Sequence, residues 1–81
     1  MAMDFEDFLN WLLTSKKLLK RSAKDVISRC KRICKLNNVS ELDQIDYETF
    51  LSSEVFLSQT MFIKSQLKRA FNLYIEFRTS K

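Results

Sequence analysis

The stretch SAKDVISRCKRICK, residues 22–35, carries the clearest helical pattern in the chain. Its apolar side chains recur every three or four residues and therefore share one helix face: Ala23, Val26, Ile27, Cys30, Ile33 and Cys34. Ser22 is a favourable N-cap, and Asp25 three residues on completes a capping-box-like pattern. Asn37 or Asn38 can take the left-handed conformation that ends a helix without glycine. We predict an amphipathic helix that is capped by Ser22.

Apolar residues on the N-terminal side of this stretch predict a first helix over about residues 3–15. Its stripe has the same helical spacing and consists of Phe5, Phe8, Leu9, Leu12 and Leu13. Three acidic residues suit its first turn, since carboxylates there complement the positive end of the helix dipole. Trp11 lies off the stripe, and we expect its ring to contact another helix from the flank. Residues 16–21 then form a basic connector.

On the C-terminal side, residues 39–57 form an acidic stretch in which we expect one short helix. Ser40 or Asp43 is placed to cap a single turn, and Asp46 is placed to cap the short helix that carries Tyr47, Phe50 and Leu51. The apolar run at residues 55–57 is expected to reach the core from a loop.

A last helix is predicted from Ser58, as its N-cap, to about Arg78. Its apolar stripe carries three aromatic rings and consists of Ile63, Leu67, Ala70, Phe71, Tyr74 and Phe77. Lys64, Lys68 and Asn72 face away from this stripe. The whole pattern predicts four helices, of which the third is short.

The composition agrees with an all-α fold. The 81 residues include no glycine and no proline, whereas tight hairpin turns depend on such residues. A chain this short makes a single domain, which we assign to residues 1–81. No apolar run is long enough to cross a membrane, and the acidic N-terminus is unlike a signal peptide. We therefore expect a cytoplasmic protein whose two cysteines are reduced.

The formal net charge of +4 conceals a strongly basic segment between two acidic ones. Residues 16–35 hold nine lysines and arginines and one acid, whereas residues 36–57 hold five acids and no base. Such clustering suits a polyanion, because bound phosphates release their counterions. The bland interpretation is a solvated face that only keeps the protein soluble. We favour double-stranded DNA as the partner, contacted by Lys16, Lys17, Lys20, Arg21, Ser22, Lys24, Arg29, Lys31 and Arg32.

The last helix offers a second predicted DNA surface at Thr60, Lys64 and Lys68. Short polar residues at the start of a helix, followed by basic ones, suit insertion into a major groove. Helix capping explains the polar residues at this start equally well. Taken by itself, this second surface is the weaker of the two.

Little in the sequence supports catalysis. There is no histidine to serve as a general base and no glycine-rich loop to cradle a phosphate. Cys30 and Cys34 lie four residues apart, but no histidine or third cysteine completes a tetrahedral metal site. We interpret both as small buried hydrophobic residues. We expect neither enzymatic activity nor a cofactor or metal.

Four segments occur in a familiar order: FLNWLL, SAKDVISRCKRI, ELDQIDYETFL and SQTMFIKSQLKRAFNLYIEF. Their succession, over about residues 5–77, resembles the SAM-like core-binding domain of tyrosine recombinases and phage integrases. The resemblance implies a compact orthogonal bundle of four helices that clamps one face of duplex DNA. Carried over by position, it assigns DNA contacts to Ser22, Lys24 and Arg29 in the second helix. In the last helix it assigns them to Thr60, Lys64 and Lys68.

The catalytic Arg, Lys, His and Tyr of that family belong to a separate domain. The resemblance therefore implies either one domain of a larger integrase or a small integrase-derived phage regulator. The alternative is a phage-type protein-interaction module or inhibitor that docks on an acidic surface of a host protein, since alternating charged segments suit such complementarity. Binding to a membrane surface is the least favoured hypothesis, because the apolar face of the second helix suits a protein core.

Overall fold

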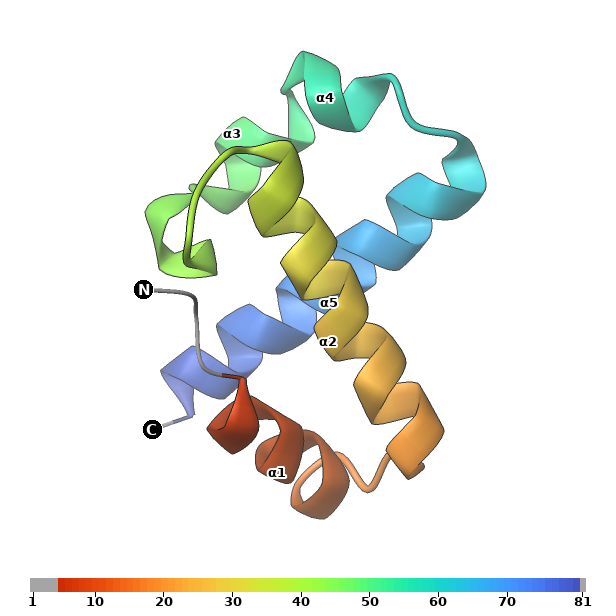
Figure 1. Cartoon of the computed structure of the whole chain (residues 1–81), viewed down its shortest axis with the longest axis vertical. Coiled ribbons are helices and arrows are strands. Elements are labelled where there is room, and N and C mark those ends of the chain that lie inside the picture. Colours follow the sequence, from red (N-terminus) through yellow and green to blue (C-terminus); the bar gives the residue numbers. More distant parts are fainter. Residues whose placement is uncertain (1–4, 81) are drawn as a thin grey trace.

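The computed structural model describes residues 5–80, and these residues form helices without any β-strand. Five α-helices and one 3₁₀ turn follow in the order α1 (Glu6–Thr14), α2 (Lys20–Leu36), η1 (Leu42–Gln44), α3 (Tyr47–Leu51), α4 (Glu54–Leu57) and α5 (Met61–Thr79). In Figure 1 the long helices α2 and α5 cross near the centre of the view. α1 lies below this crossing, and α3 and α4 lie above it. The predicted all-α fold is confirmed.

The core lies where the apolar stripes of α2 and α5 face each other and α1. All six predicted residues of α2 are buried: Ala23, Val26, Ile27, Cys30, Ile33 and Cys34. The stripe of α5 is buried at Leu67, Ala70, Phe71, Tyr74 and Phe77, and half-buried at Ile63. Helical periodicity therefore identified the buried faces of both long helices correctly.

An aromatic cluster joins α1 to the C-terminal half of α5. The ring centroid of Phe8 lies 5.3 Å from that of Tyr74, edge to face, and 5.2 Å from that of Phe77. Trp11 is half-buried, and its ring lies 5.6 Å from Phe77, which confirms the predicted flank contact. Because aromatic rings bury a large area in preferred geometries, this cluster holds α1 against the crossed helices.

The second helix begins earlier than predicted, and Ser22 is not its N-cap. α2 starts at Lys20, and Leu19 in an extended conformation is the N-cap residue. Ser22 lies inside the first turn, so the capping box expected between Ser22 and Asp25 is wrong. Both side chains are exposed on the helix surface instead.

A tight connector explains this early start. Lys17 takes a left-handed conformation with φ of 53°, and the backbone N–H of Leu18 donates to the carbonyl of Leu12 at 3.1 Å. Leu18 packs against the core, so the chain reverses direction over very few residues and enters α2 at once. At the other end of α1, the predicted start at residue 3 lies outside the described residues.

Two predictions about chain reversals in the middle of the sequence are confirmed. Asn38 follows α2 in the left-handed conformation, with φ of 59°. Asp46 caps α3, since its carboxylate accepts a hydrogen bond from the backbone N–H of Thr49 at 3.0 Å. Both residue types tolerate these positions because their short polar side chains bond to nearby backbone groups.

The turn before α3 is stabilised differently from the prediction. Neither Ser40 nor Asp43 caps η1; the N-cap is Glu41, which forms a reciprocal capping box with Gln44. The side-chain carbonyl of Gln44 accepts from the backbone N–H groups of both Ser40 and Glu41. The longer side chain of Glu41 therefore takes the capping position that the sequence predicted for Ser40 or Asp43, and Gln44 completes the reciprocal bond.

Residues 54–57 form the short helix α4, whereas the sequence predicted a loop. Ser53 caps it by accepting from the backbone N–H of Phe56, whose ring is buried. The last helix is capped by Thr60, which accepts from the backbone N–H of Ile63, and not by Ser58. The hydroxyl of Ser58 donates to a carbonyl of α4 and closes that helix instead. The described residues thus contain five α-helices where four were predicted.

Both cysteines are buried, as small hydrophobic residues would be, and Cys30 lies in the contact between α2 and α5. The thiol of Cys30 is 3.7 Å from the carbonyl oxygen of Ala70 on α5. Burial, with a smaller contribution from neighbouring Cys34, raises the pKa of Cys30 to about 12. Burial also raises the pKa of Cys34. Neither thiol is primed for nucleophilic chemistry, because the thiolate is the reactive form.

Alkaline pH is therefore expected to destabilise the fold partly through Cys30. Above its ordinary pKa of 9.0 the unfolded chain loses a thiol proton that the folded chain keeps up to about pH 12. The free energy of unfolding must fall across that interval. Urea unfolding at pH 8 and pH 10.5 should show a larger loss in the unsubstituted protein than in Cys30→Ala. Equal losses would show that this thiol does not contribute to the pH dependence.

Candidate nucleic-acid interface

The side of α2 opposite the core is almost entirely basic. Six of its lysines and arginines are exposed: Lys20, Arg21, Lys24, Lys31, Arg32 and Lys35. Lys24, Lys31 and Lys35 follow Lys20 by 4, 11 and 15 residues, which are close to whole numbers of helical turns. They therefore form one row along the helix, about 22 Å long at 1.5 Å per residue. Arg21 and Arg32, eleven residues apart, define a second row beside it.

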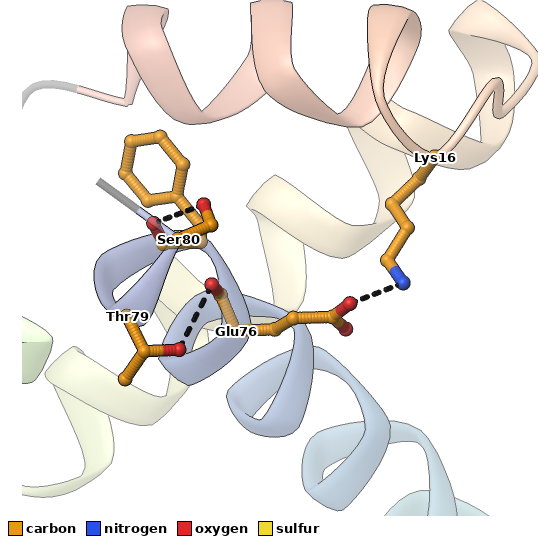
Figure 2. A network of polar contacts seen from close by, with 5 residues as sticks. Lys16, Glu76, Thr79 and Ser80 are labelled. Carbon is orange, nitrogen blue, oxygen red and sulfur yellow. Dashed lines mark hydrogen bonds and ion pairs between the residues drawn. The ribbon is translucent and has the colours of Figure 1, made fainter.

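Lys16 is the exception among the predicted phosphate contacts. Figure 2 shows its ammonium group reaching from the end of α1 to the carboxylate of Glu76 on α5, with Nζ and Oε1 2.5 Å apart. The same nitrogen lies 5.7 Å from the centroid of Trp11. Lys16 is half-buried and ties the connector to α5, so it is less available to an external anion than its neighbours.

The remaining positive charge of residues 16–35 is not neutralised within the described part of the chain. The second ion pair among the described residues joins Arg78 of α5 to Asp43 of η1, 3.4 Å apart, and includes no residue of α2. Asp43 also accepts a hydrogen bond from Tyr74 at 3.1 Å. Eight bases are consequently left without a carboxylate partner in residues 5–80: Lys17, Lys20, Arg21, Lys24, Arg29, Lys31, Arg32 and Lys35.

A hollow of about 180 Å³ separates one flank of α2 from α5. We call it the α2–α5 hollow, and its lining residues are Ser22, Asp25, Val26, Arg29, Gln66, Arg69 and Ala70. Arg29 is half-buried there, while Arg69 is exposed on the opposite wall. Asp25, the one acid of α2, lies on the same wall as Arg29. The hollow thus brings two guanidinium groups and a hydroxyl from two helices to one border of the basic face.

Sequence reasoning missed Arg69 and Gln66 as members of this region. Both lie on the flank of α5 next to its buried stripe, which is visible in the helical spacing. The sequence did not indicate which flank of α5 would face α2, because the crossing of the helices decides that. Arg69 therefore carried no signal of its own before the tertiary structure was known.

The predicted residues of the last helix lie on a different surface. Thr60 is the N-cap of α5 and its hydroxyl oxygen is engaged by the N–H of Ile63. Lys64 places its ammonium group 6.0 Å from the ring centroid of Phe56 on α4. Lys64 and Lys68 line a hollow shared with α3 and α4, in which α2 has no part. The structure therefore does not gather these residues with the basic face of α2.

Other kinds of site find little support in the described residues. Over residues 5–80, no group of three or more metal-ligating side chains comes together, and no helix is long and apolar enough to cross a membrane. The surface feature that stands out is the uncompensated charge of α2. It defines an all-helical protein with one basic helix face.

Comparisons with known proteins add no family to this description. No protein-family model matches the chain, and no curated protein or solved structure matches it significantly.

Proposed function

We propose that this protein is a duplex-DNA-binding module that uses the outer face of α2 and the bordering α2–α5 hollow. The observation that carries the proposal is the set of eight bases in residues 17–35 that have no carboxylate partner among the described residues. Such a surface is electrostatically unfavourable in isolation, since like charges repel along the helix. A polyanion relieves that repulsion and gains entropy from released counterions.

The length of the basic row suits a nucleic-acid backbone. A row of about 22 Å covers close to two-thirds of a helical turn of B-form DNA, which advances about 34 Å. Lysine and arginine contacts to phosphates fix position and orientation, and they carry no sequence information. We therefore propose sequence-tolerant binding through α2, with Arg29 and Arg69 contacting a phosphate at the edge of the row.

The helix order supports a finer proposal. A short first helix, a basic second helix, a short acidic region and a long last helix follow the pattern of the SAM-like core-binding domain of tyrosine recombinases. On this reading the crossing of α2 and α5 corresponds to the orthogonal bundle of that fold, and the chain acts in DNA recombination or integration, as a domain or as a phage regulator. Fold-level likeness alone does not establish function, so the DNA-binding proposal rests on the charge of α2.

The contribution of Thr60, Lys64 and Lys68 to DNA binding stays a prediction. Their flank of α5 borders α3 and α4. Duplex DNA that lies along α2 does not need to reach this flank.

Salt dependence is the direct test of the proposal. If the six exposed bases of α2 each neutralise a phosphate, affinity for a 20-base-pair duplex should fall by roughly a thousandfold between 50 and 200 mM salt. Fluorescence anisotropy with a labelled duplex measures this slope. Absence of binding at 50 mM salt would reject the proposal. A host protein bound with one-to-one stoichiometry by a chain that ignores DNA would favour the alternative, a module that docks on an acidic protein surface.

A further inference from the structure

Exposed apolar side chains gather at one corner of the molecule. Four large hydrophobic residues are strongly exposed in the described chain, and three of them fall within residues 57–62: Leu57 at 54 %, Met61 at 83 % and Phe62 at 71 %. We call this segment, where α4 turns into α5, the α4–α5 corner; it projects at the upper right of Figure 1. The fourth, Leu19 at 77 %, lies at the start of α2. A single exposed side chain is ordinary, but a cluster of this kind marks an interaction site.

The corner adjoins a hollow of about 320 Å³ with an apolar floor. Leu51 of α3, Phe56 of α4 and Met61 of α5 line it together with Lys64, Ser65 and Lys68. The hollow is therefore built by three helices that follow one another in the sequence. A concave apolar surface beside protruding apolar side chains is suited to receive side chains from a partner.

The rim of this hollow is positively charged. Lys64 and Lys68 lie four residues apart on α5 and so project from the same side of the helix. Neither forms an ion pair with a carboxylate in residues 5–80, and the first turn of α5 contains no acid. An occupant that carries carboxylates beside its apolar side chains would satisfy both features at once.

We propose that the α4–α5 corner and its hollow dock an acidic amphipathic helix of a partner protein. Apolar side chains of that helix, three or four residues apart, enter the hollow over Leu51 and Met61, and flanking glutamates or aspartates face Lys64 and Lys68. A second copy of the chain fits less well, because two-fold pairing of this corner would oppose its lysines to the same lysines. This surface is distinct from the basic face of α2, so the inference does not depend on DNA binding.

A pair of designed peptides tests the proposal on the full chain. One is a 16-residue helix with leucines at helical spacing and glutamates on both flanks; the other keeps the leucines and carries lysines in place of the glutamates. We expect the glutamate peptide to bind at least tenfold more tightly in fluorescence anisotropy. Met61→Gln should weaken its binding at least tenfold. Leu19→Gln, a matched loss of an exposed apolar side chain elsewhere, should leave it unchanged.

A charge exchange provides the sharper arm of the test. The double substitution Lys64→Glu and Lys68→Glu should reverse the preference, so that the lysine peptide binds more tightly than the glutamate peptide. Equal affinities for both peptides, or no binding of the glutamate peptide at millimolar concentration, would overturn the proposal. So would a dimer in sedimentation, or binding to anionic vesicles, that Met61→Gln abolishes. Unchanged DNA affinity of Met61→Gln keeps this result separate from the proposed function.

Discussion

The double substitution Lys24→Glu and Lys31→Glu is expected to weaken binding to a short DNA duplex by about 50-fold or more at 0.1 M salt, because two counterion-releasing contacts are lost and two repulsive charges gained. Both side chains are exposed, lie in the same row of α2 and lack a carboxylate partner in the described chain. The substitutions leave the buried face of α2 untouched. Circular dichroism and the urea midpoint should therefore stay close to those of the unsubstituted protein.

The informative comparison is a variant with the same change in net charge at another surface. Lys64→Glu combined with Lys68→Glu also exchanges two lysines on one helix for glutamates. If binding depends on the row along α2, this second variant should lose at least ten times less affinity. Similar losses in both variants would show that overall charge, or an extended interface that includes α5, governs binding. Anisotropy titrations at three salt concentrations separate these results through the slope of each variant.

Phe8→Ala is expected to cause a large loss of stability. The ring of Phe8 is buried and contacts Trp11, Tyr74 and Phe77 with centroid separations of 5.2 to 6.1 Å. Removing a buried phenylalanine side chain costs about 3–5 kcal/mol, since the cavity that remains is only partly filled by relaxation. A chain of this length has a total stability of about 4–12 kcal/mol. The substitution should therefore remove about a quarter or more of the free energy of unfolding and lower the urea midpoint accordingly.

Phe62→Ala provides the matched control for that experiment. It removes the same side chain from a position that is mostly exposed, where substitutions change stability by about 0.5 kcal/mol or less. Urea unfolding followed by circular dichroism measures both variants. A Phe8→Ala protein as stable as Phe62→Ala would contradict the central place of the aromatic cluster. It would also leave the attachment of α1 to α5 without an explanation.

The two faces of α2 explain how one helix can serve both stability and binding. Its apolar stripe consists of small and β-branched side chains and two cysteines, which allow α5 to approach closely at the crossing. Long lysine and arginine side chains occupy the opposite side. Because these basic residues do not contribute to the core, their charge is available to an external partner. This separation makes charge reversals on α2 a clean probe of function.

Helical spacing in the sequence was sufficient for part of the structure. The buried faces of α1, α2 and α5, the burial of both cysteines, the cap at Asp46 and the left-handed Asn38 all follow from residue type and local order. These features are local because a helix places residues three and four apart on one face whatever surrounds it. The basic character of the outer side of α2 follows from the same rule.

Helix ends were less accessible to sequence reasoning. Several serines, threonines and acidic residues compete to cap each helix, and the distances to their neighbours decide among them. Thr60, and not Ser58, caps α5, because the hydroxyl of Ser58 donates to a carbonyl at the end of α4. α2 starts at Lys20, before the predicted start at Ser22, because Leu18 packs on the core and shortens the connector.

The amino-acid order by itself determined the helical class, the apolar stripes and the concentration of positive charge in residues 16–35, since each depends on neighbours within one or two turns. Only the tertiary structure decided which basic residues remain uncompensated. Lys16 forms an ion pair with Glu76, which is sixty residues away in the chain, whereas Arg69 and Arg29 line the α2–α5 hollow together. It also left Leu57, Met61 and Phe62 uncovered at one corner. These outcomes depend on how the two long helices cross, and that crossing is set by packing between residues distant in the sequence.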